Sequence, residues 1–350
     1  MSFWKYSLAV LATSNMLGAV QAQTQTQTQT QTQTQAQAQA QGQMFKDTAL
    51  QALYQADRYD DLLRSANQRL ASQPDDAQAV LAVAMVALSR DDAAARKQAL
   101  QRAEECMEKQ PKAAPCHYAQ GVVLGVQAMS EGMLKAARSA GTVRTALTTA
   151  HELEPAWYPA RGSLVEFYLL APGMMGGSTS KAAELARAAP APEQVRALEA
   201  RIAMNERRFD EALKMLMALP AGLSPALAED VRGWAVQCAL GLTNAGQASA
   251  AQAPLEKLVR DHPEHAGPVY ALARVRAETG AHEAALQLYD QAAKLRGAET
   301  MPLAWRVGIS QQQLGRTDAA KASFQRFVAA GKGQKSSLED ARKRLAQLGA

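Results

Sequence analysis

The chain has 350 residues, a formal net charge of +5 and an aromatic content of 5%. Basic residues are interspersed with acidic ones, and no Lys/Arg block is interleaved with aromatics, so the composition disfavours a nucleic-acid-binding protein. Abundant alanine and scarce aromatics favour closely packed helices over a sheet-rich fold.

The first residues have the pattern of a cleavable export signal. Lys5 supplies a positive charge, residues 7–20 form an apolar stretch, and residues 20–22 form a small-residue cleavage site. A membrane anchor is the alternative, but the stretch contains polar residues 13–15 and is shorter than the ~20 residues of a spanning helix. We therefore predict a signal peptide over residues 1–22 and a periplasmic or secreted mature protein with no stable membrane insertion.

Residues 23–43 alternate glutamine with threonine and then alanine. A period of two can indicate a strand, but no position here is strongly apolar, so the segment has no face to bury. We predict a disordered low-complexity linker without a catalytic role.

Helical hairpins are predicted from residue 44 onward. Five weaker units have small or bulky residues at helical spacing, four of them with a proline where a helix ends. They centre on Tyr59 to Pro74, Ala99 to Pro111, Tyr118 to Pro155, Tyr168 to Pro190, and Phe209 to Leu216.

The clearest repeats lie towards the C-terminus. Gly246, Gly280 and Gly315 are 34 and 35 residues apart, and the same steps separate two further sets of equivalent positions. The set of small residues is Ala251, Ala285 and Ala320, and the set of bulky residues is Leu255, Tyr289 and Phe324. Such a period predicts stacked two-helix units in which small residues lie where helices cross and large ones fill the gaps.

This pattern resembles the tetratricopeptide repeat, which has small residues in both helices, an aromatic residue four positions later and a terminal proline. The resemblance implies an all-α, right-handed α-α superhelix. We expect a solenoid of about eight hairpins over residues 44–350, closed by a charged capping helix at residues 337–348.

Two segments depart from the period. The step from Pro111 to Pro155 is 44 residues, which places an insertion around residues 126–141. Within it, residues 127–135 are expected to lengthen both helices of the hairpin. A second insertion follows Tyr168, at residues 169–178. Residues between 115 and 190 also resemble a group of exported bacterial repeat proteins without an established activity. The matching positions are His117-Tyr118, Lys135, Leu153-Glu154-Pro155, Phe167-Tyr168, Ala171-Pro172-Gly173 and Gly176-Gly177.

The glycine-rich loop in the second insertion is a candidate site for a small ligand or anion. Backbone amides around Gly173, Gly176, Gly177 and Ser178 could hold a phosphate or carboxylate at the start of the following helix. The loop lacks the Gly-Lys-Ser/Thr ending and the preceding strand of a nucleotide-binding P-loop. The structural alternative is a tight turn between two helices.

Histidines and cysteines offer little catalytic chemistry. No pattern of zinc ligands accompanies the five histidines, so we expect no metal and no cofactor. Cys106 and Cys116 lie on either side of a predicted turn, where antiparallel helices could bring them to disulfide distance. Cys238 is expected to be an inert core thiol, since no His/Asn pair would make a cysteine nucleophilic.

The remaining candidates lie on the first helix of each hairpin, which lines the concave face in repeats of this kind. They have the side-chain types that dominate interface energetics. They are Tyr270, Arg274, Trp305, Gln312, Arg161 and Tyr118. The alternative for each is ordinary packing.

We therefore expect an exported, non-enzymatic scaffold or adaptor that binds a peptide or protein segment in its concave groove. The alternative is an accessory factor, or a small-ligand or anion binder, that uses loop 172–178. The sequence disfavours a hydrolase, because no nucleophile-elbow motif or isolated carboxylate pair is present.

Overall fold

The computed structural model describes residues 42–90, 92–331 and 333–349. These residues form α-helices and two short 3-10 helices, without β-strands. The predicted signal peptide and nearly all of the predicted linker lie outside the described residues. The last two linker residues are described, and both hydrogen-bond to the folded chain: Gly42 O accepts from Ala226 N, and Gln43 O accepts from Trp157 Nε1.

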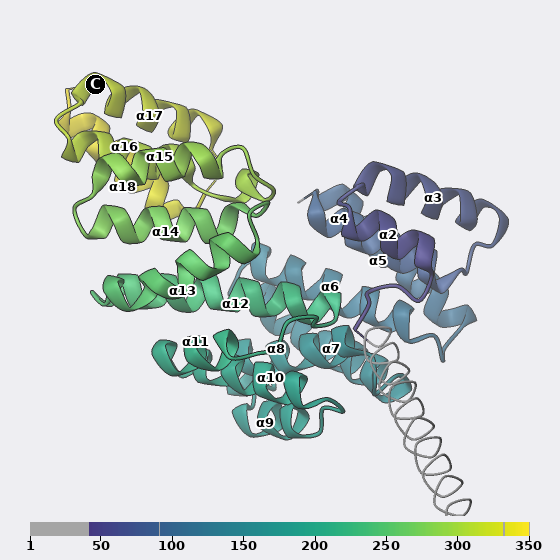
Figure 1. Cartoon of the computed structure of the whole chain (residues 1–350). Helices are drawn as coiled ribbons and strands as arrows, with labels where there is room; N and C mark the ends of the chain where they lie inside the picture. The colour runs from purple at the N-terminus through teal and green to yellow at the C-terminus, as the bar shows by residue number, and fades with distance from the viewer. Residues whose placement is uncertain (1–41, 91, 332, 350) are drawn as a thin grey trace, which may run out of the picture. The chain divides into compact units, whose positions relative to one another are not determined.

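The chain divides into two compact units (Figure 1). Unit 1 contains the described residues up to Ser178 together with Gly222–Leu227. Its helices are α2 (Thr48–Gln55), α3 (Tyr59–Ser72), α4 (Ala77–Ser89), α5 (Ala93–Lys109), α6 (Ala114–Glu131), α7 (Met133–Leu153), α8 (Tyr158–Leu170) and the 3-10 helix η1 (Gly173–Met175).

Unit 2 contains Thr179–Ala221 and the described residues from Ala228 onward. Its helices are α9 (Thr179–Arg187), α10 (Pro192–Asn205), α11 (Phe209–Met217), α12 (Pro225–Asn244, whose first turn belongs to unit 1), α13 (Ala248–Asp261), α14 (Ala266–Glu278), α15 (His282–Ala292), η2 (Ala298–Thr300), α16 (Leu303–Gln313), α17 (Thr317–Ala330) and α18 (Lys335–Gln347). In chain order, the described residues contain the α-helices α2 to α17, and α18 follows them.

The glycine period coincides with the turns inside the hairpins. Gly246, Gly280 and Gly315 have φ values of 77°, 84° and 73° and lie between α12 and α13, α14 and α15, and α16 and α17. Asp57 (φ 52°) and Arg207 (φ 63°) occupy the same position in the α2–α3 and α10–α11 turns. In all five turns the amide of the next residue donates to a carbonyl five positions earlier, which ends the first helix in the same way each time.

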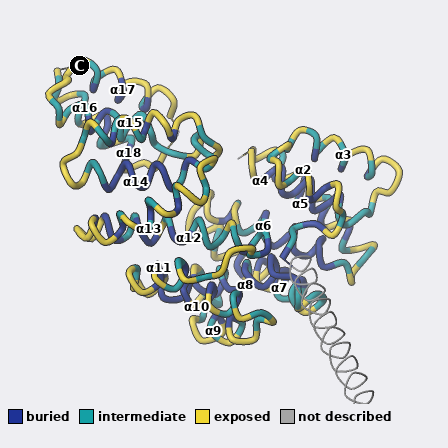
Figure 2. The backbone as a smooth tube through the Cα atoms, viewed as in Figure 1, coloured by how far each residue is buried: buried dark blue, intermediate teal, exposed yellow. Residues whose placement is uncertain are grey.

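Amphipathic helices account for most of the packing (Figure 2). On α3 the buried residues are Leu62, Ala66 and Leu70, which share one face at four-residue spacing. By contrast, α4 is buried along almost its whole length, from Ala79 to Ala87, because it packs against both α3 and α5 and also against α6. The apolar run in α4 is therefore a core helix.

The C-terminal repeats pack large residues against small ones, as predicted. Tyr289 is 1% exposed and lies in a cluster with Ala266, Ala273 and Ala285. Phe324 is fully buried with Ala320 and with Ala341 of α18, so α18 covers the end of this core. Within the described residues, no helix is long and apolar enough to cross a membrane.

Candidate binding groove

An apolar groove of about 430 Å³ lies in unit 1 between α6, α7, α8 and the residues that follow α8. Small residues of α6 and α7 form part of its lining, among them Gly121, Gly125, Ala136 and Ala140. Phe167, Leu170, Pro172 and Met175 contribute side chains from α8 and the following loop. We call this site the α6–α8 groove.

The lengths of the helices explain why this face is uncovered. α6 has 18 residues and α7 has 21, whereas α8 has 13 and ends at Leu170 before Pro172. Between α6 and α7 the chain turns at Gly132, which has a φ of 93°. The predicted lengthening of this hairpin is thus present, and both insertions contribute to the same groove.

The exposed apolar side chains of the described chain gather here. The large hydrophobic residues with high exposure are Val126 (40%), Met129 (73%), Met133 (73%), Leu134 (69%), Leu170 (54%) and Met174 (92%). Four of the six line the groove, and Leu134 and Met174 directly follow or precede a lining residue in the chain. A cluster of exposed apolar side chains is typical of an interaction site, whereas single ones are ordinary.

The glycine-rich loop is folded on itself and has few amides left for an anion. The amides of Met175 and Gly177 donate to Pro172 O, Gly176 N donates to Gly173 O, and Ser178 N donates to Tyr168 O. The backbone amides of Gly176, Gly177 and Ser178 are therefore not available to donate to an anion, as the predicted anion site would require. The loop contributes apolar atoms of Pro172 and Met175 to the α6–α8 groove instead.

The backbone of this loop requires glycine at positions 176 and 177. A Cβ on Gly177 would stand 1.7 Å from Ala171 O, and Gly176 has a φ of 98°. Gly173 has open space around it. Substituting valine at Gly176 or Gly177 would therefore disrupt the turn itself and would not report on ligand binding.

Two of the predicted concave-face residues lie in unit 1 and are buried. Tyr118 is 5% exposed, contacts the Trp157 ring at 4.8 Å between centroids, and its hydroxyl lies 3.2 Å from Ser163 Oγ. Arg161 is 4% exposed and donates to Pro155 O. Burial lowers the pKa of Arg161. Both side chains serve internal contacts.

The other four lie in unit 2 and are also engaged. Tyr270 is 7% exposed against Tyr289. Trp305 donates from Nε1 to Asp340 Oδ2 of α18 at 2.7 Å, and Gln312 Oε1 accepts from Arg344 Nη1 of the same helix. Arg274 is 8% exposed and lines a separate polar pocket. Aromatic and arginine side chains at these positions therefore join neighbouring helices.

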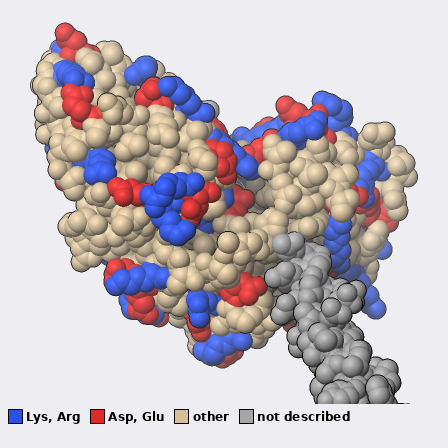
Figure 3. All heavy atoms as spheres, viewed as in Figure 1, with Lys and Arg blue, Asp and Glu red and all other residues tan. Residues whose placement is uncertain are grey.

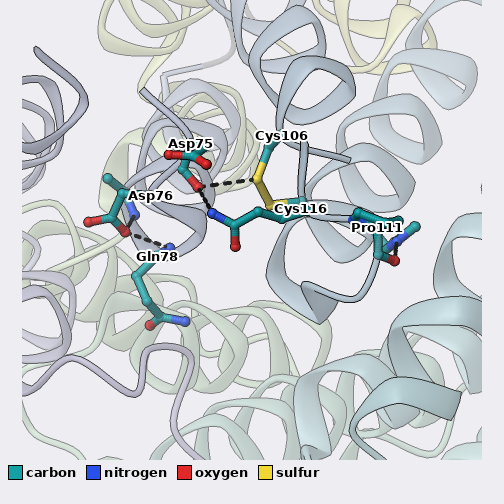
Figure 4. Close-up of a disulfide and its surroundings, with 9 residues drawn as sticks. Asp75, Asp76, Gln78, Cys106, Pro111 and Cys116 are labelled. Carbon is teal, nitrogen blue, oxygen red and sulfur yellow. Dashed lines mark hydrogen bonds between the residues drawn. A yellow bond between two sulfur atoms is a disulfide. The ribbon is translucent and has the colours of Figure 1, made fainter. Parts of the chain in front are cut away.

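Cys106 and Cys116 form a disulfide with a Cα–Cα distance of 6.0 Å (Figure 4). Cys106 is the last buried residue of α5, and Cys116 lies in the buried first turn of α6. Asp75 O, from the turn before α4, lies 3.7 Å from Cys106 Sγ. Cys238 is free and fully buried, and burial raises its pKa to about 12. A thiol with such a pKa is not a nucleophile near neutral pH.

The described residues contain no group of three His, Cys, Asp or Glu side chains placed to hold a metal ion. His262 and His265 lie near each other, with ring centroids 6.1 Å apart. Burial and the nearby Arg232 lower the pKa of His265 to about 4, although Glu264 Oε1 lies 3.1 Å from its Nε2 and acts in the opposite direction. Burial is the larger effect.

Solved structures provide the comparison for the fold. The chain is similar to the human IFIT1 dimer with PPP-AAAA, with a TM-score of 0.54 and 14% identity over 78% of this chain and 63% of that one. An IFIT1 monomeric mutant with Gppp-AAAA gives a TM-score of 0.53 and 14% identity, covering 82% of this chain and 67% of that one. A crystal structure of a tetratricopeptide repeat protein from Parabacteroides merdae covers 83% of this chain and 99% of that one, with 10% identity and a TM-score of 0.46.

The fold is a tetratricopeptide-like, all-α solenoid. The glycine turns, the small–large packing and the IFIT1 likeness agree on this, so the predicted all-α, tetratricopeptide-like fold is confirmed. The chain spans about two thirds of the IFIT1 chains. No protein-family model and no curated protein sequence matches the chain. The RNA ligands in the IFIT1 structures are ligands of that protein, and the likeness here is one of fold.

Proposed function

We propose that the protein is a non-enzymatic interaction scaffold that binds the apolar face of a partner helix in the α6–α8 groove. The gathering of exposed apolar side chains at this one groove is the observation that carries the proposal. Amphipathic helices dock into apolar grooves through residues at i, i+3, i+4 and i+7. Methionine suits such a surface because its flexible, polarisable side chain adapts to different partners.

A protein helix fits the surface better than a small molecule does. Met129, Met133, Leu134 and Met174 are each more than two-thirds exposed, so apolar surface continues beyond the cavity onto its rim. A ligand confined to the cavity would leave that rim in water. A partner helix would cover the cavity and the rim together.

The charges on the surface argue against a nucleic-acid partner. On the face seen in Figure 3, Lys and Arg side chains are interspersed with Asp and Glu. Many of them are paired, as in Lys135 with Glu131 at 3.2 Å and Lys214 with Asp210 at 2.6 Å. Binding to a phosphate backbone needs concentrated positive charge.

Peptide selection tests the proposal directly. A library of displayed 18-residue amphipathic helices is selected against the full chain, and bound peptides are measured against Met129→Glu/Met133→Glu. Both residues are 73% exposed, so the variant should fold normally. We expect selected peptides to have apolar residues at helical spacing and to bind the variant at least ~10-fold more weakly, which corresponds to ~1.4 kcal/mol.

The matched control is Ser130→Glu/Ala137→Glu, which adds the same charges to exposed positions of α6 and α7 outside the groove lining. It should leave peptide affinity unchanged within about twofold, since exposed charges act weakly at a distance in salt. Peptides that bind all three proteins equally would contradict the proposal.

A second candidate function is the binding of a small apolar ligand in the same groove. The volume of about 430 Å³ lies within the ~300–1,000 Å³ typical of small-molecule pockets, and loop residues Pro172 and Met175 line it. Titration with long-chain fatty acids and with the selected peptides separates the two. Saturable fatty-acid binding that displaces no peptide, or binding without any peptide selected, would favour the small-ligand function.

The proposal includes export to an oxidising compartment. The pattern of residues 1–22 and the disulfide between Cys106 and Cys116 support it, since structural disulfides persist outside the cytosol. Fractionation of cells producing the full chain, with mass spectrometry of its N-terminus, tests this. A protein that keeps Lys5 and remains with the cytosolic fraction would contradict it.

A further inference from the structure

The most exposed methionines of the described chain surround one site. Met129 and Met133 are each 73% exposed and line the α6–α8 groove, and Met174 is 92% exposed and precedes Met175, which also lines it. The other methionines in the described residues are buried or half-buried. This distribution adds a chemical property to the groove, because the thioether sulfur of methionine reacts with oxidants.

The exposed methionines lie in the two segments that depart from the repeat. Met129 is in the last turn of α6 and Met133 is the first residue of α7, on either side of Gly132. Met174 is the middle residue of η1. Both insertions therefore bring methionine sulfur to the same groove.

Peroxide oxidises such a side chain in a single two-electron step. The thioether sulfur attacks one oxygen of hydrogen peroxide, so that a sulfur–oxygen bond forms and the oxygen–oxygen bond breaks. The proton on the transferred oxygen moves to the departing oxygen, which leaves as water. Sulfur is oxidised, peroxide is reduced, and the product is a polar methionine sulfoxide that reductases convert back to methionine.

The folded protein without a partner tolerates sulfoxides at these three positions. An exposed sulfoxide oxygen stays hydrated, so it places no polar group in the core. By contrast, Met85 and Met204 are 7% and 8% exposed, and a sulfoxide at either position would be buried at a cost to stability. Oxidation of the exposed methionines alone should therefore leave the fold intact.

A partner helix would remove water from the same sulfoxides. The sulfoxide oxygen accepts hydrogen bonds, and Ser163 is the one hydrogen-bond donor among the side chains that line the groove. The Ser163 hydroxyl lies 3.2 Å from the Tyr118 hydroxyl and is already engaged. Because burying an unpaired polar group is unfavourable, oxidation opposes partner binding without opposing folding.

We propose that Met129, Met133 and Met174 are sites of reversible oxidation by peroxide, and that this oxidation releases the partner from the α6–α8 groove. The inference rests on the proposed function of the groove and adds the reaction that regulates it. Leu134 and Leu170 keep their apolar surface after oxidation, so the affinity for the partner should fall without vanishing.

Peptide mapping by mass spectrometry tests the sites on the full chain. In dilute hydrogen peroxide, Met129, Met133 and Met174 should be oxidised at least ~10-fold faster than the buried Met85 and Met204, since susceptibility follows exposure. This measurement needs no partner. Equal rates at all five positions would overturn the proposal whether or not the groove binds a helix.

The peptides selected for the groove measure the consequence of oxidation. Protein oxidised at the exposed methionines should bind them at least ~10-fold more weakly, and methionine sulfoxide reductases should restore the affinity. Unoxidised protein treated with the same reductases and reductant controls for reduction of the disulfide between Cys106 and Cys116. Unchanged affinity after oxidation, or a loss that the reductases do not reverse, would overturn the proposal.

Met129→Leu/Met133→Leu/Met174→Leu separates the loss of sulfur from the loss of apolar surface. Leucine is apolar and of similar volume, so this variant should bind the peptides within ~threefold of the parent protein. Peroxide should no longer change its affinity. A variant that remains sensitive to peroxide would show that another group carries the effect and would overturn the proposal.

The two proposals fail in different ways. If the unoxidised protein binds no helical peptide, the proposed function is wrong, and release of a partner by oxidation is wrong with it. If peptides bind the unoxidised and the oxidised protein equally, the proposed function holds and regulation by oxidation is wrong.

Discussion

A Cβ atom placed on Gly308 of α16 would stand 2.7 Å from Cε1 of Phe324 on α17. The same close approach recurs elsewhere: Gly121 faces Leu147 at 2.7 Å and Gly241 faces Phe209 at 2.8 Å. In each case a helical glycine lets a large side chain of another helix lie against the backbone. The small–large period in the sequence therefore corresponds to specific contacts between helices.

Gly308→Ala should destabilise unit 2. Alanine gains up to ~1 kcal/mol in helix propensity, but overpacking against the buried Phe324 ring costs ~1–3 kcal/mol. Urea unfolding of Gly308→Ala, of Phe324→Leu and of the double variant measures the coupling free energy between the two positions. We expect the two substitutions to couple by at least ~0.5 kcal/mol, with alanine better tolerated beside leucine. Additive effects would mean that the ring moves aside without cost.

Arg207→Gly should stabilise the protein. Arg207 is exposed and has a φ of 63°, in a turn where three other hairpins have glycine. A non-glycine residue in this conformation costs on the order of 1 kcal/mol, so glycine should raise the free energy of unfolding by up to that amount. Asp57→Gly is the matched comparison, since Asp57 has a φ of 52° and aspartate tolerates this region better than arginine does. A larger gain at Asp57 than at Arg207 would contradict this explanation.

Much of the fold could be predicted from the sequence because its strongest signals are local. Gly246, Gly280 and Gly315 reveal their turns by residue type, since glycine is favoured at positive φ. Asp57 and Arg207 adopt the same turn but give no such signal, so the first hairpins could only be placed by phase. The residues at which the helices of these hairpins begin and end depend on backbone hydrogen bonds, and the pattern of side chains does not reveal those bonds.

The sites were harder to predict because they depend on which segments meet. The insertions around 126–141 and at 169–178 could be recognised as departures from the period. That both line one groove could not be predicted. Trp305 and Gln312 were selected for their chemical type, yet their partners Asp340 and Arg344 come from the capping helix. The high exposure of Met129 has no sequence signature, because exposure is a property of the packed structure.

Removing the disulfide should destabilise unit 1. Cys106 and Cys116 are separated by 10 residues, and closing a loop of this size stabilises the folded state by ~2.5–3 kcal/mol in the chain-entropy account. Cys106→Ala/Cys116→Ala should lose about that amount in urea unfolding. Cys238→Ala, which leaves the disulfide intact, serves as the comparison.

The state of the cysteines can be measured on the intact chain. Alkylation in denaturant without reductant should add one group, at Cys238, and prior reduction should allow three. Alkylation under native conditions should leave Cys238 unmodified, because it is buried and its pKa is raised to about 12. Three modifications without reductant would contradict the disulfide.

Stability should fall as the pH drops from about 6.5 to about 4. Burial lowers the pKa of His151 and of His265 to about 4, with Arg161 and Arg232 contributing as nearby cations. The folded state therefore favours neutral imidazole, and its advantage is complete above the unfolded pKa of ~6.5 and lost towards pH 4. Each histidine should contribute a slope of up to ~1.4 kcal/mol per pH unit in this window.

Single substitutions show how much each histidine contributes to this pH dependence of stability. In urea unfolding between pH 4 and 8, His265→Gln and His151→Gln should each reduce the steepness, and the double variant should be the flattest. His262 is less informative, because its pKa is lowered by a smaller amount through the same burial. A slope that both variants leave unchanged would mean that other groups take up the protons.

Gly125→Leu should close the α6–α8 groove without damaging the fold. Gly125 lines the groove, and a Cβ there would meet only Val143 Cγ1, at an ordinary 3.8 Å. Leucine also has the better helix propensity, so stability should be unchanged or higher by up to ~1 kcal/mol. Peptides selected for the groove should bind this variant at least ~10-fold more weakly, since a side chain would fill space that the peptide needs.

Gly121→Leu provides the contrast one turn earlier on α6. It also lines the groove, but its Cβ would stand 2.7 Å from Leu147 Cδ2, so the substitution should cost ~1–3 kcal/mol in stability. The two variants together separate a blocked groove from a disturbed hairpin. If Gly125→Leu is stable and still binds the selected peptides with full affinity, the partner helix binds at another surface.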